Sequence, residues 1–383
     1  MKFIKNYANT KGAEMLQEAG ITVNGSNPWD IHIHNDNFFL RLLFYGTVAL
    51  GESYVDGWWD VEKLDQFVYK LLDAKLVDHK SYTLQHPIAK ILNKLRFLSP
   101  LFFNKQNKTQ ASKDVKYHYN IGNDLFEAML DKRMNYSCAY WKNAKNLDEA
   151  QEAKLDMICK KLKLEPGMSV LEIGCGWGGF AKYAIEKYGV RVRGITLSEN
   201  QRDYALKYCK GLNFQADIID YREIQGQYDR VVSIEMIEHV GPKNYQEYFQ
   251  VIDRCLKKEG LCLIQFDGKS ESLHWNDVWI EKYIFPNTVT PSPKQITTAI
   301  ENLFFIVDWE DFTKDYHTTM MEWDKNIDKN WETLKKNYDE RFYRMWKFYL
   351  LYCPATALAK SQHLWQVVFQ KTDSQQDYYR VDV

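Results

Sequence analysis

Hydrophobic positions in the C-terminal two thirds of the chain fall into short apolar runs separated by segments with helical spacing. The runs that we predict to be strands are 169–173, 190–195, 230–234, 261–266, 304–308 and 364–369. Helices are expected between them, one ending near Tyr188 and another over 243–257. Alternation of strands and helices predicts an α/β protein with a parallel, doubly wound sheet.

The N-terminal pattern is different, with shorter and more mixed elements. Residues 31–34 alternate like a strand, and the segment 51–60 (GESYVDGWWD) is expected to be a turn. Apolar residues recur at helical spacing over 88–98, and polar, loop-like residues follow from 104 to 113. We therefore predict a smaller mixed N-terminal domain, associated with lipid or membrane, over 1–110. The catalytic domain is predicted over 111–383.

Two connections in the predicted catalytic domain, 268–293 and 314–353, are long and rich in aromatic residues. Connections of this length in a compact domain are uncommon and are often functional. Aromatic residues make up 15% of the whole chain, which is more than an ordinary core requires. We expect both connections to be helical insertions that roof the ligand edge of the sheet.

The formal net charge is −1, which argues against nucleic acid as the main partner. Basic residues are nevertheless concentrated in 79–113, where seven Lys or Arg occur without Asp or Glu. Residues 1–7 lack the apolar run of a signal peptide, and no stretch approaches about 20 apolar residues. The seven cysteines include no CxxC pair, so reduced thiols, a cytoplasmic location and no metal site are expected.

The most specific local motif is the glycine-rich segment 172–179, EIGCGWGG, which closes a predicted strand and opens a helix. Gly174, Gly176 and Gly178 would let a ligand approach the backbone at the carboxyl edge of the sheet. The spacing is E-x-G-x-G-x-G, and Glu172 stands where a carboxylate can reach a ligand ammonium group. These two details favour S-adenosylmethionine over NAD. The alternative is that the segment is a tight strand–helix turn that binds no ligand.

The end of the next strand agrees with this interpretation. It reads Thr196-Leu197-Ser198, whereas an NAD enzyme usually places an acid there to hold the ribose. Glu199 comes slightly late, in the first turn of the next predicted helix, and is expected to interact with the helix dipole. The candidate cofactor-binding residues are Tyr136, Ser137, Glu172, Gly174, Gly176, Gly178, Thr196, Leu197, Gln201 and Asp220.

Motifs over nearly the whole chain resemble the cyclopropane fatty acid synthase family. They are 117–119 (YHY), 122–126 (GNDLF), 136–141 (YSCAYW), 174–179, 237–242 (IEHVGP), 282–286 (KYIFP) and 364–369 (LWQVVF). The resemblance implies a Rossmann-like class I methyltransferase sheet that uses S-adenosylmethionine. It also implies unsaturated phospholipid acyl chains at the inner membrane surface as substrates, a cyclopropane ring as product, and a homodimer.

In this family the alkene attacks the methyl group of the cofactor, and a base removes a proton from the new methyl before ring closure. The resemblance implies that bound bicarbonate is this base and that Cys138, Glu238 and Tyr316 help to hold it. Cys353 matches a family cysteine that we expect to line the pocket. Water must be excluded from such a site, because it would quench a carbocation.

The chain departs from the family where the family has a His-Thr-Ile sequence, because it reads Gln265-Phe266-Asp267 there. Gln265 cannot transfer a proton or carry a positive charge. Asp267 adds a carboxylate where the family recruits an anion, so we expect it to replace bicarbonate, with Gln265 donating to it. The alternative is that bicarbonate still binds. A close pair of acids, Glu238 and Asp267, would raise the pKa of one of them.

Three other functions remain open from the residues alone. The first is methylation or methylenation of an acyl-chain alkene without ring closure. The second is a small-molecule N-methyltransferase with the same fold, which would not need the proton-acceptor set of Glu238 and Tyr316. The third is a lipid-binding protein without activity, against which the complete glycine loop and Glu172 argue.

Overall fold

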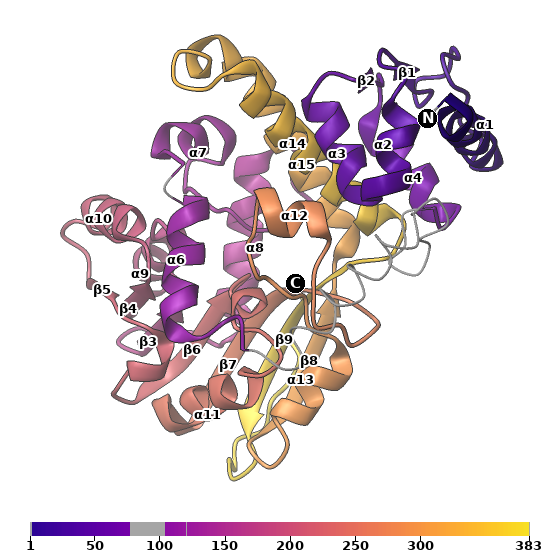
Figure 1. Ribbon diagram of the computed structural model, residues 1–383. Helices are drawn as coiled ribbons and strands as arrows, with labels where there is room; N and C mark the ends of the chain where they lie inside the picture. The colour runs from indigo at the N-terminus through magenta and orange to yellow at the C-terminus, as the bar shows by residue number, and fades with distance from the viewer. Residues whose placement is uncertain (1, 77–103, 120, 383) are drawn as a thin grey trace. The chain divides into compact units, whose positions relative to one another are not determined.

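The computed structural model describes residues 2–76, 104–119 and 121–382 and contains two compact units (Figure 1). The first unit contains the residues up to Phe103 together with Trp275–Pro286 and Trp323–Ser361. The second contains Asn104–His274, Asn287–Glu322 and Gln362–Val383. The units differ from the predicted domains 1–110 and 111–383, because two later segments cluster with the N-terminal residues.

The second unit holds the central sheet and the helices around it. Its helices are α6 (Lys108–Tyr119), α7 (Asn123–Met129), α8 (Leu147–Lys161), α9 (Gly179–Tyr188), α10 (Glu199–Tyr208), η1 (Tyr221–Glu223), η2 (Ile237–His239), α11 (Tyr245–Cys255) and α13 (Pro293–Ala299). Its strands are β3 (Ser169–Ile173), β4 (Arg191–Thr196), β5 (Phe214–Ile218), β6 (Tyr228–Ile234), β7 (Leu256–Gly268), β8 (Phe304–Asp311) and β9 (His363–Lys371). Helix α14 (Thr313–Leu334) begins in this unit.

The seven strands lie in the order β5-β4-β3-β6-β7-β9-β8. The first five pair in parallel, which confirms the α/β class. The six predicted strands are all present, as β3, β4, β6, β7, β8 and β9. Strand β9 pairs antiparallel with both β7 and β8, so this edge of the sheet departs from the predicted all-parallel arrangement. Strand β5 was not predicted, because its sequence FQADI is short and lacks a continuous apolar run.

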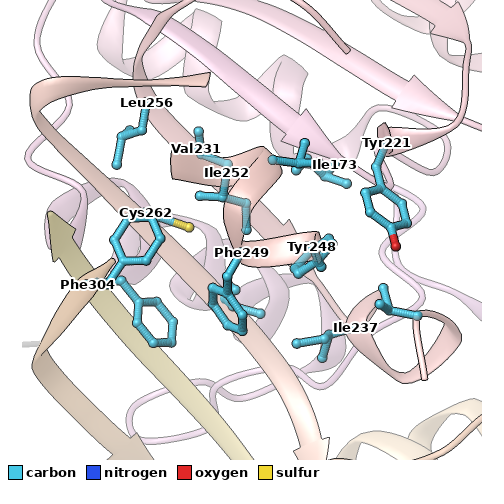
Figure 2. Packing of buried hydrophobic residues seen from close by; sticks show 14 of the residues in the cluster. Ile173, Tyr221, Val231, Ile237, Tyr248, Phe249, Ile252, Leu256, Cys262 and Phe304 are labelled. Atoms are coloured by element: carbon cyan, nitrogen blue, oxygen red, sulfur yellow. The ribbon is translucent and has the colours of Figure 1, made fainter. Parts of the chain in front are cut away.

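Hydrophobic residues cover both faces of the sheet, as a parallel sheet requires. On one face, Leu171 and Val231 pack with α11 and α13, and Figure 2 shows this cluster around Phe249 and Ile252. On the other face, Val170 and Val232 pack with α8 and α9. Neighbouring residues of one strand thus point to opposite layers. This packing leaves the carboxyl ends of β3, β4 and β6 to form the walls of a site.

The first unit is mostly helical. Its elements are α1 (Lys2–Glu18), β1 (His32–Ile33), α2 (Phe38–Tyr45), α3 (Thr47–Val55), β2 (Trp59–Asp60), α4 (Leu64–Asp73), α12 (Val278–Tyr283), the rest of α14, and α15 (Glu340–Leu358). The buried Trp59 ring packs on Phe38 and Phe67, and its indole N–H donates to the Leu50 carbonyl at 3.0 Å. Helix α15 packs on α3 and α4.

The predicted turn over 51–60 is wrong in its first half, because residues 51–55 belong to α3. Gly51 is needed there for close packing: a Cβ atom at this position would lie 2.4 Å from Trp279 Nε1. A turn follows, and β2 then pairs with β1.

Other expectations have mixed outcomes. The connection 314–353 is largely helical, as predicted, whereas 268–293 is mostly loop, with α12 as its one full helix. Their place as a roof over the sheet stays a prediction. The basic residues Lys80, Lys90, Lys94 and Arg96 lie outside the described residues. In the part of the chain that the structure describes, no helix is long and apolar enough to cross a membrane.

Candidate active site

The glycine loop follows β3 directly and requires glycine at several positions. Gly174, Gly176 and Gly178 have φ values of 84°, 50° and 86°, which side chains with a Cβ atom rarely adopt. A Cβ atom on Gly179, the first residue of α9, would lie 2.4 Å from the Arg133 carbonyl oxygen. The loop thus brings the bare backbone to the edge of a cavity at the carboxyl ends of the strands.

The cavity collects nearly all the predicted cofactor-binding residues. Those that line it are Tyr136, Ser137, Glu172, Gly174, Gly176, Thr196, Leu197, Gln201 and Asp220. Gly178 does not line the cavity but provides the left-handed N-cap of α9. The residues come from β3, β4, the end of β5 and the segment before α8, so the tertiary fold assembles them from distant parts of the sequence.

Glu172 has the chemistry expected of a residue that binds an ammonium group. It is 3% exposed, and its Oε2 atom is buried without a hydrogen-bond partner. Burial raises the pKa of its carboxyl group well above the usual value, and the charge of Lys154 opposes that rise. A cation in the cavity would satisfy the unpaired oxygen and favour the ionised form. The amino acid part of S-adenosylmethionine fits this requirement.

The opposite wall of the cavity is polar and internally hydrogen-bonded. Thr196 donates its hydroxyl to Gln201 Oε1 at 2.8 Å, next to the N-terminus of α10. Asp220 accepts from the Arg222 backbone N–H and from its guanidinium group, each at 3.0 Å. Arg222 also lines the cavity, although the sequence did not single it out. Glu199 lies in the first turn of α10, as predicted.

Glu235 is an acid in the cavity wall that sequence reasoning missed. It directly follows β6 and has φ of 49°, a conformation that only the surrounding structure can enforce. Its Oε1 accepts the Cys138 backbone N–H at 2.8 Å and the Gln265 side-chain amide at 2.8 Å. Burial raises the pKa of the Glu235 carboxyl group, and these two hydrogen bonds oppose the rise.

Gln265 therefore does not serve Asp267 as expected. Its Nε2 donates to Glu235 and to the Cys138 carbonyl oxygen, and its Oε1 accepts from Gln366 on β9. All of its amide atoms are thus committed to a buried network. The prediction failed because Glu235, from the neighbouring strand β6, lies closer to the amide than the residue two positions along β7 does.

Asp267, which is half-buried, and Glu238, which is buried, do form a close pair of acids. The Asp267 backbone N–H donates to Glu238 Oε1 at 2.6 Å. Side-chain hydrogen bonds from Tyr316 and Gln362 also reach the Asp267 carboxyl group. Burial raises the pKa of both acids well above the usual values, and the negative charge of Asp267 raises that of Glu238 further.

Two further residues are His239, which lines the cavity, and Cys353, which was predicted to line the pocket. Burial lowers the pKa of His239 to about 4, so this cavity residue is neutral at physiological pH. Cys353 lies on α15 in the first unit, whereas the other predicted catalytic residues lie in the second. Its role as a pocket-lining residue stays a prediction.

Cys138 contributes to the cluster through its backbone. The thiol is fully buried, and burial raises its pKa well above the usual value, with Glu235 adding to the rise. A protonated thiol is neither a nucleophile nor a base. The contact with Glu235 is made by the backbone N–H, which every amino acid except proline supplies.

We accordingly expect Cys138→Ala to keep kcat within about threefold of the unchanged chain, because the backbone donor to Glu235 remains. Steady-state kinetics would measure this. The exposed-thiol reagent iodoacetamide at pH 8 should also leave Cys138 unmodified, as mass spectrometry of peptides can show. A loss of activity of a hundredfold with normal folding would mean that the thiol itself takes part.

Comparison with known proteins agrees with this geometry. The family model described as mycolic acid cyclopropane synthetase matches residues 106–367. The cyclopropane-fatty-acyl-phospholipid synthase of Escherichia coli K12 is 47% identical over 94% of this chain and 92% of its own length. The tuberculostearic acid methyltransferase UfaA1 of Mycobacterium tuberculosis is 32% identical over 85% of this chain and 79% of its own.

A solved structure shows the same fold. The mycolic acid cyclopropane synthase CmaA1 in complex with SAH and CTAB has a TM-score of 0.64 and 28% identity. It covers 68% of this chain and 98% of its own length.

Proposed function

This chain belongs to the mycolic acid cyclopropane synthetase family, and we propose that it converts cis-unsaturated phospholipid acyl chains to cyclopropane chains with S-adenosylmethionine. The observation that carries the proposal is the half-buried Glu235 carboxyl group in the wall of the cofactor cavity, which accepts the Cys138 backbone N–H. Ring formation needs a proton acceptor at the site of methyl transfer, and Glu235 provides one.

The cavity residues would hold the cofactor, which when bound supplies an electrophilic methyl group. Glu172 would hold its ammonium group, and the bare backbone of Gly174 and Gly176 would let it approach the edge of the sheet. Because an alkene is a weak nucleophile, the orientation of the acyl chain against the methyl group dominates the rate. The buried aromatic residues Trp177, Phe180 and Tyr221 line the cavity and would limit the access of water.

Within this proposal Glu235 accepts the proton that the new methyl group loses as the ring closes. The backbone N–H of Cys138, a residue that the resemblance assigns to holding bicarbonate, donates to Glu235 instead, and so does the Gln265 amide. The carboxylate of Glu235 thus provides the negative charge, and added bicarbonate is not required. Asp267 remains in the proposal as the partner of Glu238, whose carboxyl group accepts the Asp267 backbone N–H.

We also propose that the enzyme works as a peripheral protein at an anionic membrane surface and as a homodimer. The basic run over 79–113 supports the membrane part, because each basic residue near such a surface contributes about 1 kcal/mol. The resemblance supports the dimer, which analytical ultracentrifugation would test.

The membrane proposal predicts that Lys90→Glu/Lys94→Glu weakens binding to phosphatidylglycerol vesicles at least tenfold at low salt. Raising the ionic strength should weaken the binding of the unchanged chain in the same way, because salt screens the attraction. Vesicle co-sedimentation measures both effects. Binding that ignores both salt and the double substitution would refute an electrostatic contact.

The reaction itself is tested by incubating the protein with S-adenosylmethionine and vesicles of monounsaturated phospholipid. Mass spectrometry should show a gain of one CH₂ per converted chain, and NMR should show cyclopropane protons. A branched methyl or methylene signal would instead identify methylation or methylenation of the alkene without ring closure. Absence of any transfer to lipid would overturn the proposal.

A further inference from the structure

A fully buried lysine lies in the wall behind the cofactor cavity. Lys154, on α8, is 0% exposed, and its Nζ donates to Ser137 Oγ at 2.6 Å. One turn earlier on the same helix, Gln151 donates its side-chain amide to the backbone carbonyls of Ser137 at 2.7 Å and Asn135 at 3.3 Å. Helix α8 thus holds the segment that contributes Asn135, Tyr136 and Ser137 to the cavity.

Three carboxyl groups from different elements act on this ammonium group. They belong to Asp131 in the loop after α7, to Glu172 on β3 and to Glu235 at the end of β6, and the Cys138 thiol faces it as well. Burial lowers the pKa of Lys154, and the negative charges of Glu235, Asp131 and Glu172 oppose this effect. Burying a charge is costly unless opposite charges compensate, so the lysine and the acids depend on one another.

The contact with Lys154 also determines whether the Ser137 hydroxyl group donates or accepts a hydrogen bond in the cavity. An ammonium group has donors but no acceptor. Ser137 Oγ must therefore accept from Lys154, and its own proton is directed to another acceptor. Because Ser137 lines the cavity, the hydroxyl group becomes a donor toward an anionic group of a bound molecule.

We propose that Lys154 is a positioning residue of the cofactor site: its charge supports Glu172 and Glu235 as anions and makes Ser137 a donor to the cofactor carboxylate. The inference rests on the proposed cofactor site but not on the lipid reaction. Glu172 then binds the ammonium end of the cofactor and Ser137 the carboxylate end, so the buried lysine acts on both ends without contacting the cofactor itself.

Binding of S-adenosylhomocysteine, followed by calorimetry from pH 6.5 to 9, tests this inference without any lipid substrate. Lys154→Met should weaken binding about tenfold at pH 6.5 and much less at pH 9. The reason is that loss of the positive charge raises the pKa of Glu172, so a higher pH is needed to ionise it. Lys154→Arg should restore the pH dependence of the unchanged chain, even if the affinity is lower.

Lys161→Met is the matched control, because Lys161 is a second fully buried lysine on α8. It pairs with Asp308 at 3.1 Å and with Glu310 at 2.5 Å, and neither acid lines the cavity. This variant should lose stability without a change in the pH dependence of binding. The inference would be overturned if Lys154→Met lost the same affinity for S-adenosylhomocysteine at every pH. It would also be overturned if Lys161→Met shifted the pH dependence of binding in the same way.

If Lys154→Met does not fold, Lys154→Gln, which is neutral but still a donor to Ser137, takes its place beside Lys154→Arg. The neutral variant should show the shift to higher pH and the charged variant should not. Because the readout is ligand binding, a failed lipid assay would not affect this test, and a failed binding test would leave the lipid assay open.

Discussion

Replacing Glu235 by Gln should lower kcat for ring formation by about 10³-fold, within the range that a positioned general base contributes. The amide has nearly the shape of the carboxyl group but cannot take a proton at neutral pH. Binding of S-adenosylhomocysteine should stay within about threefold of the unchanged chain. Initial rates with monounsaturated phospholipid vesicles and calorimetry of the product complex would measure the two effects separately.

Two further variants make this prediction specific. Glu301→Gln, which changes an exposed acid of the same unit, should leave kcat unchanged. Glu235→Gly suits the positive φ at this position and leaves the Cys138 and Gln265 donors free for a small anion. Added bicarbonate or formate should therefore restore part of its activity. An unchanged enzyme that stops when bicarbonate is removed would contradict the role of Glu235.

Replacing Asp267 by Asn should remove most ring formation, by about 10- to 100-fold, while cofactor binding persists. The same variant should be more stable than the unchanged chain at pH 8. A buried acid whose pKa is raised in the folded state destabilises the protein as pH rises above the usual carboxyl range. The expected rise in Tm is about 2–4 °C at pH 8, and it should disappear near pH 4.

Asp229→Asn provides a control of opposite sign. Asp229 accepts from Lys257 at 2.7 Å and from Ser169, and these contacts lower its pKa to about 2. Its contribution to stability is present above the unfolded pKa of about 4 and is lost as pH falls toward 2. This variant should lower Tm at pH 8. A fall in Tm for Asp267→Asn at that pH, or full activity, would show that Asp267 has another role.

Local sequence was sufficient for much of the fold and for most of the residues that line the cavity. Apolar runs of strand length predicted six of the seven strands of the sheet, because each run must be buried on both faces. The glycine loop was recognisable because its function depends on backbone conformations that few residues other than glycine adopt. Glu172, two positions before Gly174, could be assigned from that spacing alone.

The proton-acceptor cluster was decided by tertiary structure. Glu235 and Cys138 are 97 positions apart, and no local pattern indicates that they meet. The one available signal was that Glu235 is an acid directly after a predicted strand. This signal places Glu235 at the carboxyl edge of the sheet but does not indicate which residues contact it. Gln265 donates to Glu235 rather than to Asp267 because neighbouring strands β6 and β7 bring the two side chains together.

The same distinction holds for Lys154 and for the edge of the sheet. A lysine in an amphipathic helix is normally expected in solvent, yet Lys154 is buried because three acids from other elements compensate its charge. Strand β9 was predicted from its apolar run, but its antiparallel place between β7 and β8 depends on the path of the preceding chain. Periodicity and spacing determine local structure, whereas contacts between distant residues depend on the packing of the whole unit.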